Sequence, residues 1–597
     1  MTRYLFTGVL ATAVLVAIGQ TSEPVAEQAS ALAPALPIDV PEGWIVQARS
    51  TEAAARAVEA VGGTVVEELG IINGVAAELT PSQRQIIDGV KLFANSEITV
   101  AARTRGKKSA GLTALSPVAA VATAGTSSLV ADQLQGAITA ADVQNNPSYN
   151  PGFLDANLVH DSGVLGTGVR VAVVDSGIWS DKDASGIGTR VLGEVNTLGP
   201  SVVISRAEHS DENGHGTHVA SAMLSSGSWQ GGYEGIAPGA GLISVKAFDE
   251  EGRGSYLSVI RAIDWVVSTN DATNVRVMNL SFSATPQSHY WDDPINQAVM
   301  QAWAQGIVVV ASAGNTGPDA LSIGVPGNNP YVITVGAMSD NFTPADASDD
   351  HLASFSSAGP TYEGFVKPEV VAPGGHVLGR MDPSSTIGLA HPASTHIRGN
   401  LFTMSGTSQA AALVSGVAAL MLESDSSLSP DDVKCRLMAS SRPALDADGQ
   451  LAYSVFQQGA GLVNALGAVN SGATGCANRG LDIVADLKGE THFAGPAQRG
   501  KDGGYYVMDM GAPTPGQLLD SDGFVWSDGF VWGDGFVWSD GFVWSDGFVW
   551  SDGFVWSDGF VWSDGFVWSQ GFVWSDSFVE RRPKFSTAGV GEWVPHE

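Results

Sequence analysis

Residues 169–174, "VRVAVV", form a valine-rich run that continues directly into Asp175. A strand that is apolar on both faces belongs inside a parallel sheet covered by helices. Four similar runs follow, and helical patterns separate several of them: "LISVKAF" at 242–248, "VRVMNLSF" at 275–282, "GIVVVASAG" at 306–314 and "YVITVGA" at 331–337. We therefore expect residues 141–470 to form a doubly wound, mostly parallel α/β domain with its site outside the carboxyl ends of the strands.

The composition of the chain limits its partners. Of 597 residues, 44% are hydrophobic, which is enough for at least one large core. Thirty Lys and Arg stand against 62 Asp and Glu, a formal net charge of -32. Such a charge repels a phosphate backbone, so we expect no nucleic-acid partner.

The amino-terminal residues are typical of a secretory signal peptide, which we place at 1–31. Arg3 precedes an apolar stretch from Leu5 to Ile18, and the small residues "ASA" end the segment. A short membrane anchor is the weaker alternative, because a spanning helix needs roughly 20 apolar residues. We expect a secreted protein, extracellular or associated with a cell surface. Export permits a disulfide between the two cysteines, Cys435 and Cys476, although two separate thiols are equally compatible with the sequence.

Residues 42–102 predict a small α+β domain. The patterns read as strand, helix, strand, strand, helix and strand, with Ser50 and Thr80 at the two helix starts and "EITVAA" at 97–102 as the closing strand. This order is that of ferredoxin-like domains. Residues 103–140 are rich in Ala, Ser, Thr and Gly, which predicts a flexible linker open to proteases.

The carboxyl-terminal region divides into a linker region at 471–520, hexapeptide repeats at 521–579 and a tail at 580–597. The repeats hold nine copies of Phe-Val-Trp, mostly within "SDGFVW". Asp-Gly favours a tight hairpin turn, so the repeats predict a meander or a small solenoid whose aromatic residues bind carbohydrate, a cell surface or another copy. A flexible extension of low complexity is the plain alternative.

Four polar residues stand where elements of the α/β domain begin or end. Asp175 and Asn315 follow strands, whereas His215 and Ser408 precede helices rich in small residues. Each has an ordinary interpretation, such as a turn residue or, for Ser408, a helix cap. A zinc site at His215 and His218 lacks a third ligand. Together, however, a carboxylate, an imidazole, an amide donor and a hydroxyl form the set that acyl transfer needs.

The segments that carry these residues resemble the active-site motifs of the subtilisin-like serine proteases: "VAVVDSGI" at 171–178, "NGHGTHVAS" at 213–221, "VVVASAGN" at 308–315 and "SGTSQAA" at 405–411. The resemblance implies that Asp175 orients His215, which accepts the proton of Ser408, and that Asn315 lines the oxyanion hole. It also implies that 42–102 is an inhibitory propeptide of a self-processing zymogen, with the maturation site in the 103–140 linker.

The same resemblance implies a primary specificity pocket. Its floor would be Gly324, which favours a bulky apolar or aromatic side chain. Its walls would be Ser281, Phe282 and Ser283 on one side and Ser312, Ala313 and Gly314 on the other.

Two departures from the family pattern stand out. Ala412 and Leu413 occupy places where the family usually has Pro and His. The loop that follows the His215 helix lacks the Asn-rich calcium pattern. We therefore expect no cofactor for the chemistry and assign no metal ligand, and structural calcium stays open because no recognisable loop supports it.

These features predict an exported serine endopeptidase that acts on polypeptides, has its own propeptide as an intramolecular inhibitor and forms an acyl-enzyme. The alternative is a surface adhesin in which the repeats carry the function and the peptidase domain only matures the chain. A complete set of four site residues argues against an inactive scaffold.

Overall fold

The structure is a computed structural model that describes most of the chain between residues 40 and 514. The described ranges are 40–100, 149–204, 210–341, 343, 349–394, 400–446, 450–499, 504–509 and 512–514, with two short strands in the repeats, β23 (Phe560–Val561) and β24 (Phe572–Val573). These two strands pair in parallel. The expected signal peptide, the 103–140 linker, the 580–597 tail and the rest of the repeats lie outside the described residues.

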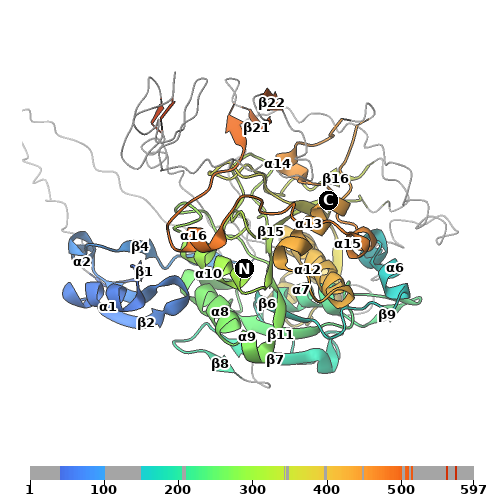
Figure 1. Cartoon of the computed structure of the whole chain (residues 1–597). Helices are drawn as coiled ribbons and strands as arrows, with labels where there is room; N and C mark the ends of the chain where they lie inside the picture. Colours follow the sequence, from blue (N-terminus) through green and yellow to red (C-terminus); the bar gives the residue numbers. More distant parts are fainter. Residues whose placement is uncertain are drawn as a thin grey trace, which may run out of the picture.

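A nine-stranded sheet forms the centre of the fold, and it contains all five of the predicted apolar strands (Figure 1). Its order is β16-β15-β14-β13-β6-β11-β7-β8, with β17 beside β15. The pairs are parallel except for β8 and β16 at the edges. The strands are β6 (Arg170–Asp175), β7 (Val191–Asn196), β8 (Val203–Ile204), β11 (Gly241–Lys246), β13 (Val275–Leu280), β14 (Val308–Ser312), β15 (Ile333–Ser339), β16 (His351–Leu352) and β17 (Val370–Pro373).

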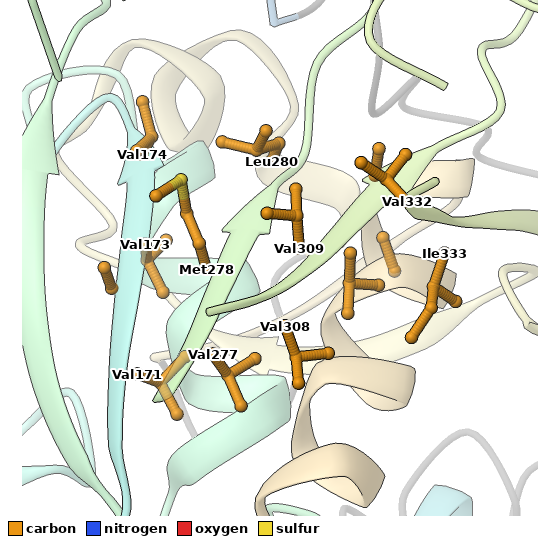
Figure 2. Packing of buried hydrophobic residues seen from close by; sticks show 14 of the residues in the cluster. Val171, Val173, Val174, Val277, Met278, Leu280, Val308, Val309, Val332 and Ile333 are labelled. Atoms are coloured by element: carbon orange, nitrogen blue, oxygen red, sulfur yellow. The ribbon is translucent and has the colours of Figure 1, made fainter. Parts of the chain in front are cut away.

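Two pairs of helices cover the sheet. Helices α7 (His215–Leu224) and α12 (Thr407–Ser424) pack on each other, as do α8 (Tyr256–Ser268) and α10 (Pro294–Ala304), and each pair also contacts the strands. Valine and isoleucine side chains fill the space between the layers, and Val173, Val277 and Val308 are buried there (Figure 2). The α/β prediction is confirmed, because these strands have no solvated face.

Other elements surround this core, and most of them are short. They are α5 (Tyr149–Phe153), α6 (Ala156–Asp161), α9 (Asn270–Thr273), α11 (Thr386–Ala390), α13 (Pro430–Ser440), α14 (Val455–Gln458), α15 (Ala465–Asn470), the 3-10 turns Gly70–Ile72, Gly188–Arg190 and Pro392–Ser394, and the strands β9 (Ser228–Trp229), β10 (Gly232–Tyr233), β18 (Val377–Arg380) and β19 (Leu401–Met404). Within the described ranges, no helix combines the length and the apolarity needed to cross a membrane.

A separate four-stranded sheet precedes the peptidase domain. Its order is β2-β3-β1-β4, and α1 packs on it. Ser50 and Thr80 cap the two helices through their side chains, at the predicted positions. The elements are β1 (Glu42–Gln47), α1 (Thr51–Ala60), β2 (Thr64–Leu69), β3 (Gly74–Leu79), α2 (Pro81–Ile86) and β4 (Lys91–Ala94).

The closing strand of this sheet was predicted in the wrong place. The fourth strand is β4 at 91–94, whereas β5 (Glu97–Thr99) leaves the sheet and pairs antiparallel with β12 (Arg253–Ser255) of the peptidase domain. Ile98 becomes fully buried there. An apolar strand pairs with any open edge that covers its side chains, so its local pattern does not select the partner.

The expected linker region at 471–520 is also partly structured. It contains α16 (Ile483–Leu487), β20 (Ala497–Arg499), β21 (Tyr505–Asp509) and β22 (Ala512–Thr514). The buried carboxylate of Asp486 accepts hydrogen bonds from the hydroxyls of Tyr290 (2.6 Å) and Tyr331 (3.1 Å). A disulfide joins Cys435 to Cys476, which settles the pairing that the sequence left open.

Candidate active site

The carboxylate of Asp175 and the imidazole of His215 form a buried pair. Asp175 is the last residue of β6 and His215 the first residue of α7. The Nδ1 atom of His215 lies 2.7 Å from Oδ1 of Asp175, which also accepts the backbone N–H of Ser176 at 2.7 Å. The carboxylate therefore fixes both the orientation of the ring and the proton on Nδ1.

A second carboxylate, Asp211, holds the first turn of α7 against the end of β6. Its Oδ1 accepts the hydroxyl of Ser176 at 2.8 Å, and its Oδ2 accepts both the backbone N–H and the hydroxyl of Thr217 at 2.7 Å. The Ser176 hydroxyl in turn accepts the N–H of Gly216 at 2.9 Å. Asp211 was not among the predicted site residues, although it lies four residues before His215.

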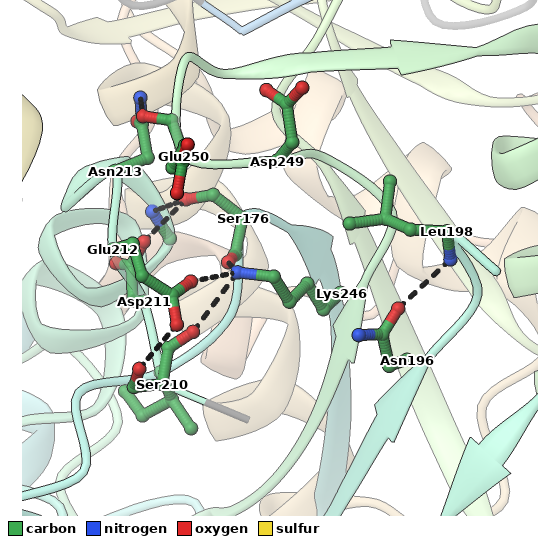
Figure 3. Close-up of polar contacts among 12 residues, drawn as sticks. Ser176, Asn196, Leu198, Ser210, Asp211, Glu212, Asn213, Lys246, Asp249 and Glu250 are labelled. Carbon is green, nitrogen blue, oxygen red and sulfur yellow. Dashed lines mark hydrogen bonds and ion pairs between the residues drawn. The ribbon is translucent and has the colours of Figure 1, made fainter. Parts of the chain in front are cut away.

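Lys246, the last residue of β11, places a positive charge beside the segments that carry Ser176 and Ser210. Its ammonium group donates to the carbonyls of Ser176 (2.8 Å) and Ser210 (3.0 Å) and pairs with Glu212 (Figure 3). Because Ser176 follows Asp175 directly, the lysine fastens the loop before α7 to the chain segment that carries the Asp175 carboxylate.

Ser408 is not a helix cap. Helix α12 begins at Thr407 with Gly406 at its N-cap position, and no side chain caps it. The Ser408 hydroxyl instead donates to the carbonyl of Ser281 at 3.1 Å. It is buried at the end of the helix that carries partial positive charge. Capping therefore does not account for this serine.

Helices α7 and α12 meet next to Ser408. Gln409, the following residue, places Nε2 3.5 Å from Nδ1 of His218, one turn along α7 from His215. The other ring nitrogen of His218 lies 3.0 Å from the carbonyl of Phe402. Burial lowers the pKa of His218 to about 4, so the ring is neutral. Its occupied nitrogens argue against a zinc site.

Asn315 has a fixed amide. Its Oδ1 accepts the backbone N–H of Thr407 at 3.1 Å and the Thr407 hydroxyl at 2.9 Å. The Nδ2 group is buried and finds no hydrogen-bond partner among the described residues. Because the oxygen is engaged, the amide is held with its N–H donors free for another acceptor.

Three of the candidate residues each keep a buried polar atom unpaired. Asp175 Oδ2, His215 Nε2 and Asn315 Nδ2 are all buried without a partner in the described part of the chain. Such atoms are rare in folded proteins, and a substrate bound beside them would supply partners. The hydroxyl of Ser408 hydrogen-bonds Ser281 rather than His215, and such a catalytic bond often tightens only when substrate binds.

The segments predicted to surround the specificity pocket lie together. The Ser312 hydroxyl donates to the carbonyl of Phe282 at 2.9 Å, and the N–H of Gly324 donates to Ala313 at 3.2 Å. The N–H of Gly314 donates to the hydroxyl of Thr407 at 3.2 Å, which connects these segments to the nucleophile helix.

A segment of the chain occupies the open edge at β12. Strand β5 pairs with β12, and the N–H of Val100 then donates to Gly252 at 2.8 Å. The side chains of Ile98 and Val100 are fully buried against the peptidase domain. This arrangement is that of an extended peptide added to a sheet edge. The pairing of β5 with β12 was not predicted, because the sequence pattern at 97–102 was assigned to the smaller sheet.

The described residues contain no group of three or more His, Cys, Asp or Glu side chains arranged to hold a metal ion.

Comparisons with known proteins agree with this geometry. The model of the Subtilase family matches residues 166–461. The chain is 40% identical over 312 residues to the serine protease AprX of Bacillus subtilis (strain 168), an alignment that covers 51% of this chain and 67% of AprX. It is 31% identical over 318 residues to subtilisin DY of Bacillus licheniformis, covering 53% of this chain and 96% of subtilisin DY.

A solved structure shares the fold. The crystal structure of fervidolysin from Fervidobacterium pennivorans, a keratinolytic enzyme related to subtilisin, superimposes with a TM-score of 0.54 at 22% identity and covers 72% of this chain and 61% of fervidolysin. With the sequence matches, the conclusion is that this chain belongs to the subtilase family and is a subtilisin-like serine endopeptidase.

Proposed function

We propose that the protein is an exported endopeptidase that hydrolyses peptide bonds through an acyl-enzyme formed on Ser408. His215 Nε2 accepts the hydroxyl proton as Oγ attacks the scissile carbonyl, and returns this proton to the leaving amine. Asp175 stabilises the imidazolium that forms between these steps. A water molecule then attacks the acyl group in the same way, with His215 accepting its proton. The carboxylic acid product leaves, and the Ser408 hydroxyl is regenerated.

The oxyanion that forms during each attack is stabilised by the free Nδ2 group of Asn315 and the backbone N–H of Ser408. The observation that carries the proposal is the 2.7 Å contact between His215 and Asp175, with the opposite ring nitrogen buried and unpaired among the described residues. A base in this state is oriented and ready to accept a proton.

The protein is made as a zymogen in this proposal, with residues 42–102 as the inhibitor. The small sheet contacts the peptidase domain through Lys91 with Asp292 and Glu67 with Arg261, while β5 lies along β12. A peptide held in this way blocks the edge to other peptides. Self-cleavage in the segment after Val100, which includes the expected 103–140 linker, would release the inhibitor.

The aromatic repeats support a second role, in attachment to carbohydrate or to a cell surface. Nine Phe-Val-Trp copies recur along the sequence, and their aromatic side chains offer large apolar faces for stacking. Deletion of residues 515–597 tests this role: casein hydrolysis should persist while attachment to cells is lost. Attachment that persists in the folded, processed truncation would contradict this role.

Active-site labelling tests the main proposal. A fluorophosphonate should modify the secreted, processed protein at a single serine, which peptide mapping should identify as Ser408. Modification of another serine, or hydrolysis of casein without modification of Ser408, would contradict the acyl-enzyme mechanism.

A further inference from the structure

The hydroxyl of Ser283 lies in the space between two glycines of the specificity pocket. A Cβ atom added to Gly324 would fall 1.9 Å from the Ser283 hydroxyl oxygen, and one added to Gly314 would fall 3.0 Å from it. The pocket floor and one wall therefore both face this hydroxyl. The absence of side chains at the two glycines does not leave the space empty, because Ser283 extends into it.

Backbone hydrogen bonds hold Ser283 in this position. The next residue, Ala284, exchanges two hydrogen bonds with Val325, at 2.9 Å and 2.7 Å. This bridge holds the backbone beside Ser283 and the backbone beside Gly324 in fixed register. A large substrate side chain must therefore either stop at the Ser283 hydroxyl or turn it about its own side-chain bond.

The hydroxyl also differs from its neighbours in its contacts. Ser281 and Ser312 each donate to a backbone carbonyl. Within the described chain, the Ser283 hydroxyl makes no such bond, and the residue is only 2% exposed. A hydroxyl with no protein partner can bond a water molecule or a polar atom of the substrate.

We propose that Ser283 shortens the primary pocket and makes the enzyme prefer a small residue before the scissile bond. This inference rests on the proposed function and revises the expectation of a bulky apolar preference. A phenyl ring would have to displace the hydroxyl or leave it buried without a partner, whereas a methyl group or a small hydroxyl leaves room for the water it needs.

The segment that occupies the edge at β12 agrees with this preference. After Val100, whose N–H is bonded to Gly252, the chain continues with Ala101 and Ala102. If self-cleavage takes place at the very start of the linker, the residue before the scissile bond is Ala102, whose side chain is a methyl group.

Two peptide substrates that differ only in Ala or Phe before the scissile bond test the proposal on the full-length, self-processed enzyme. The wild type should show the higher kcat/KM with Ala. Ser283→Gly should raise the Phe-to-Ala ratio of kcat/KM by about tenfold or more, the size of effect that small changes in pocket volume produce. Ser283→Thr should lower it. A wild-type preference for Phe, or an unchanged ratio in Ser283→Gly, would overturn the proposal.

Ser283→Ala separates volume from hydrogen bonding, because it removes the hydroxyl and keeps Cβ. It should give a ratio between those of the wild type and Ser283→Gly. If the variants fail to process themselves, inhibition of the wild type by peptide aldehydes ending in Ala or Phe answers the same question, with tighter binding of the Phe aldehyde as the opposing result. Fluorophosphonate labelling distinguishes the failures: an unlabelled Ser408 rejects the proposed function, whereas labelled enzyme with a Phe preference rejects only this inference.

Discussion

Ser281 and Ser408 bind each other reciprocally, because each hydroxyl donates to the backbone carbonyl of the other residue, at 2.9 Å and 3.1 Å. Ser281 follows β13 and Ser408 lies in the first turn of α12. The pair therefore fastens helix α12 to the end of the central sheet.

Ser408→Ala should abolish proteolysis and release of the propeptide together. Loss of the nucleophile removes the covalent route, and in subtilisin itself this loss lowers kcat about a millionfold. Gel analysis of secreted protein and casein hydrolysis measure the two effects. Ser415→Ala is the matched control, since Ser415 lies on the same helix and its hydroxyl bonds Asn279. Self-processing by pure Ser408→Ala protein would contradict the assignment.

Asn315→Ala should lower kcat by about 100- to 1000-fold with little change in KM, because the amide donates to charge that develops only in the transition state. This is the magnitude found for the corresponding donor in subtilisin. Thr407→Val is the control for positioning: it removes the hydroxyl that donates to Asn315 Oδ1 but keeps the backbone N–H bond. Steady-state kinetics should show a smaller loss in this variant, and equal losses would assign Asn315 a structural role.

Ile98→Asp should weaken inhibition by the amino-terminal domain. The side chain of Ile98 is fully buried against the peptidase domain, so a carboxylate there must be desolvated or must leave the edge. Propeptide added in trans should inhibit the mature enzyme with an inhibition constant at least tenfold higher. Ile86→Asp is the control, because Ile86 belongs to the same domain and is 67% exposed. Equal inhibition by both variants would place the inhibitory contact elsewhere.

His218 should make the fold less stable in acid. The unfolded chain binds a proton at this residue near pH 6.5, whereas burial lowers the pKa in the folded protein to about 4. Between these values the unfolded state holds more protons, so the free energy of unfolding falls as the pH falls, by about 2 kcal/mol at pH 5 relative to pH 7.5.

Denaturant unfolding of the Ser408→Ala protein, which cannot digest itself, measures this effect. His218→Gln in the same background should remove this part of the pH dependence. If both proteins lose stability equally between pH 7.5 and pH 5, another group is responsible.

Much of the fold was predictable because its signals are local. The valine-rich runs that became β6, β11, β13, β14 and β15 are apolar on both faces, and only a covered parallel sheet buries such strands. Asp175 and Asn315 follow two of these strands, and parallel strands share one carboxyl edge. The pairing of His215 with Asp175 follows from this geometry.

Other features depend on contacts that no local pattern contains. The sequence around 97–102 predicted a strand correctly but not its partner. The open edge of β12, at residues 253–255, competes with the smaller sheet for this strand. The helix-start pattern at Ser408 did not reveal that Gly406 holds the cap position and that Ser281 accepts the hydroxyl. The structured part of 471–499 depends on Asp486 meeting two distant tyrosines.

The amino-acid sequence by itself determined the α/β architecture and the candidates for the acyl-transfer residues, because hydrophobic periodicity and residue chemistry are written along the chain. Only the tertiary structure decided which edge β5 joins, which atoms of the site stay unpaired, and that Ser283 extends between Gly314 and Gly324. These outcomes depend on distances between segments far apart in sequence, and packing sets such distances.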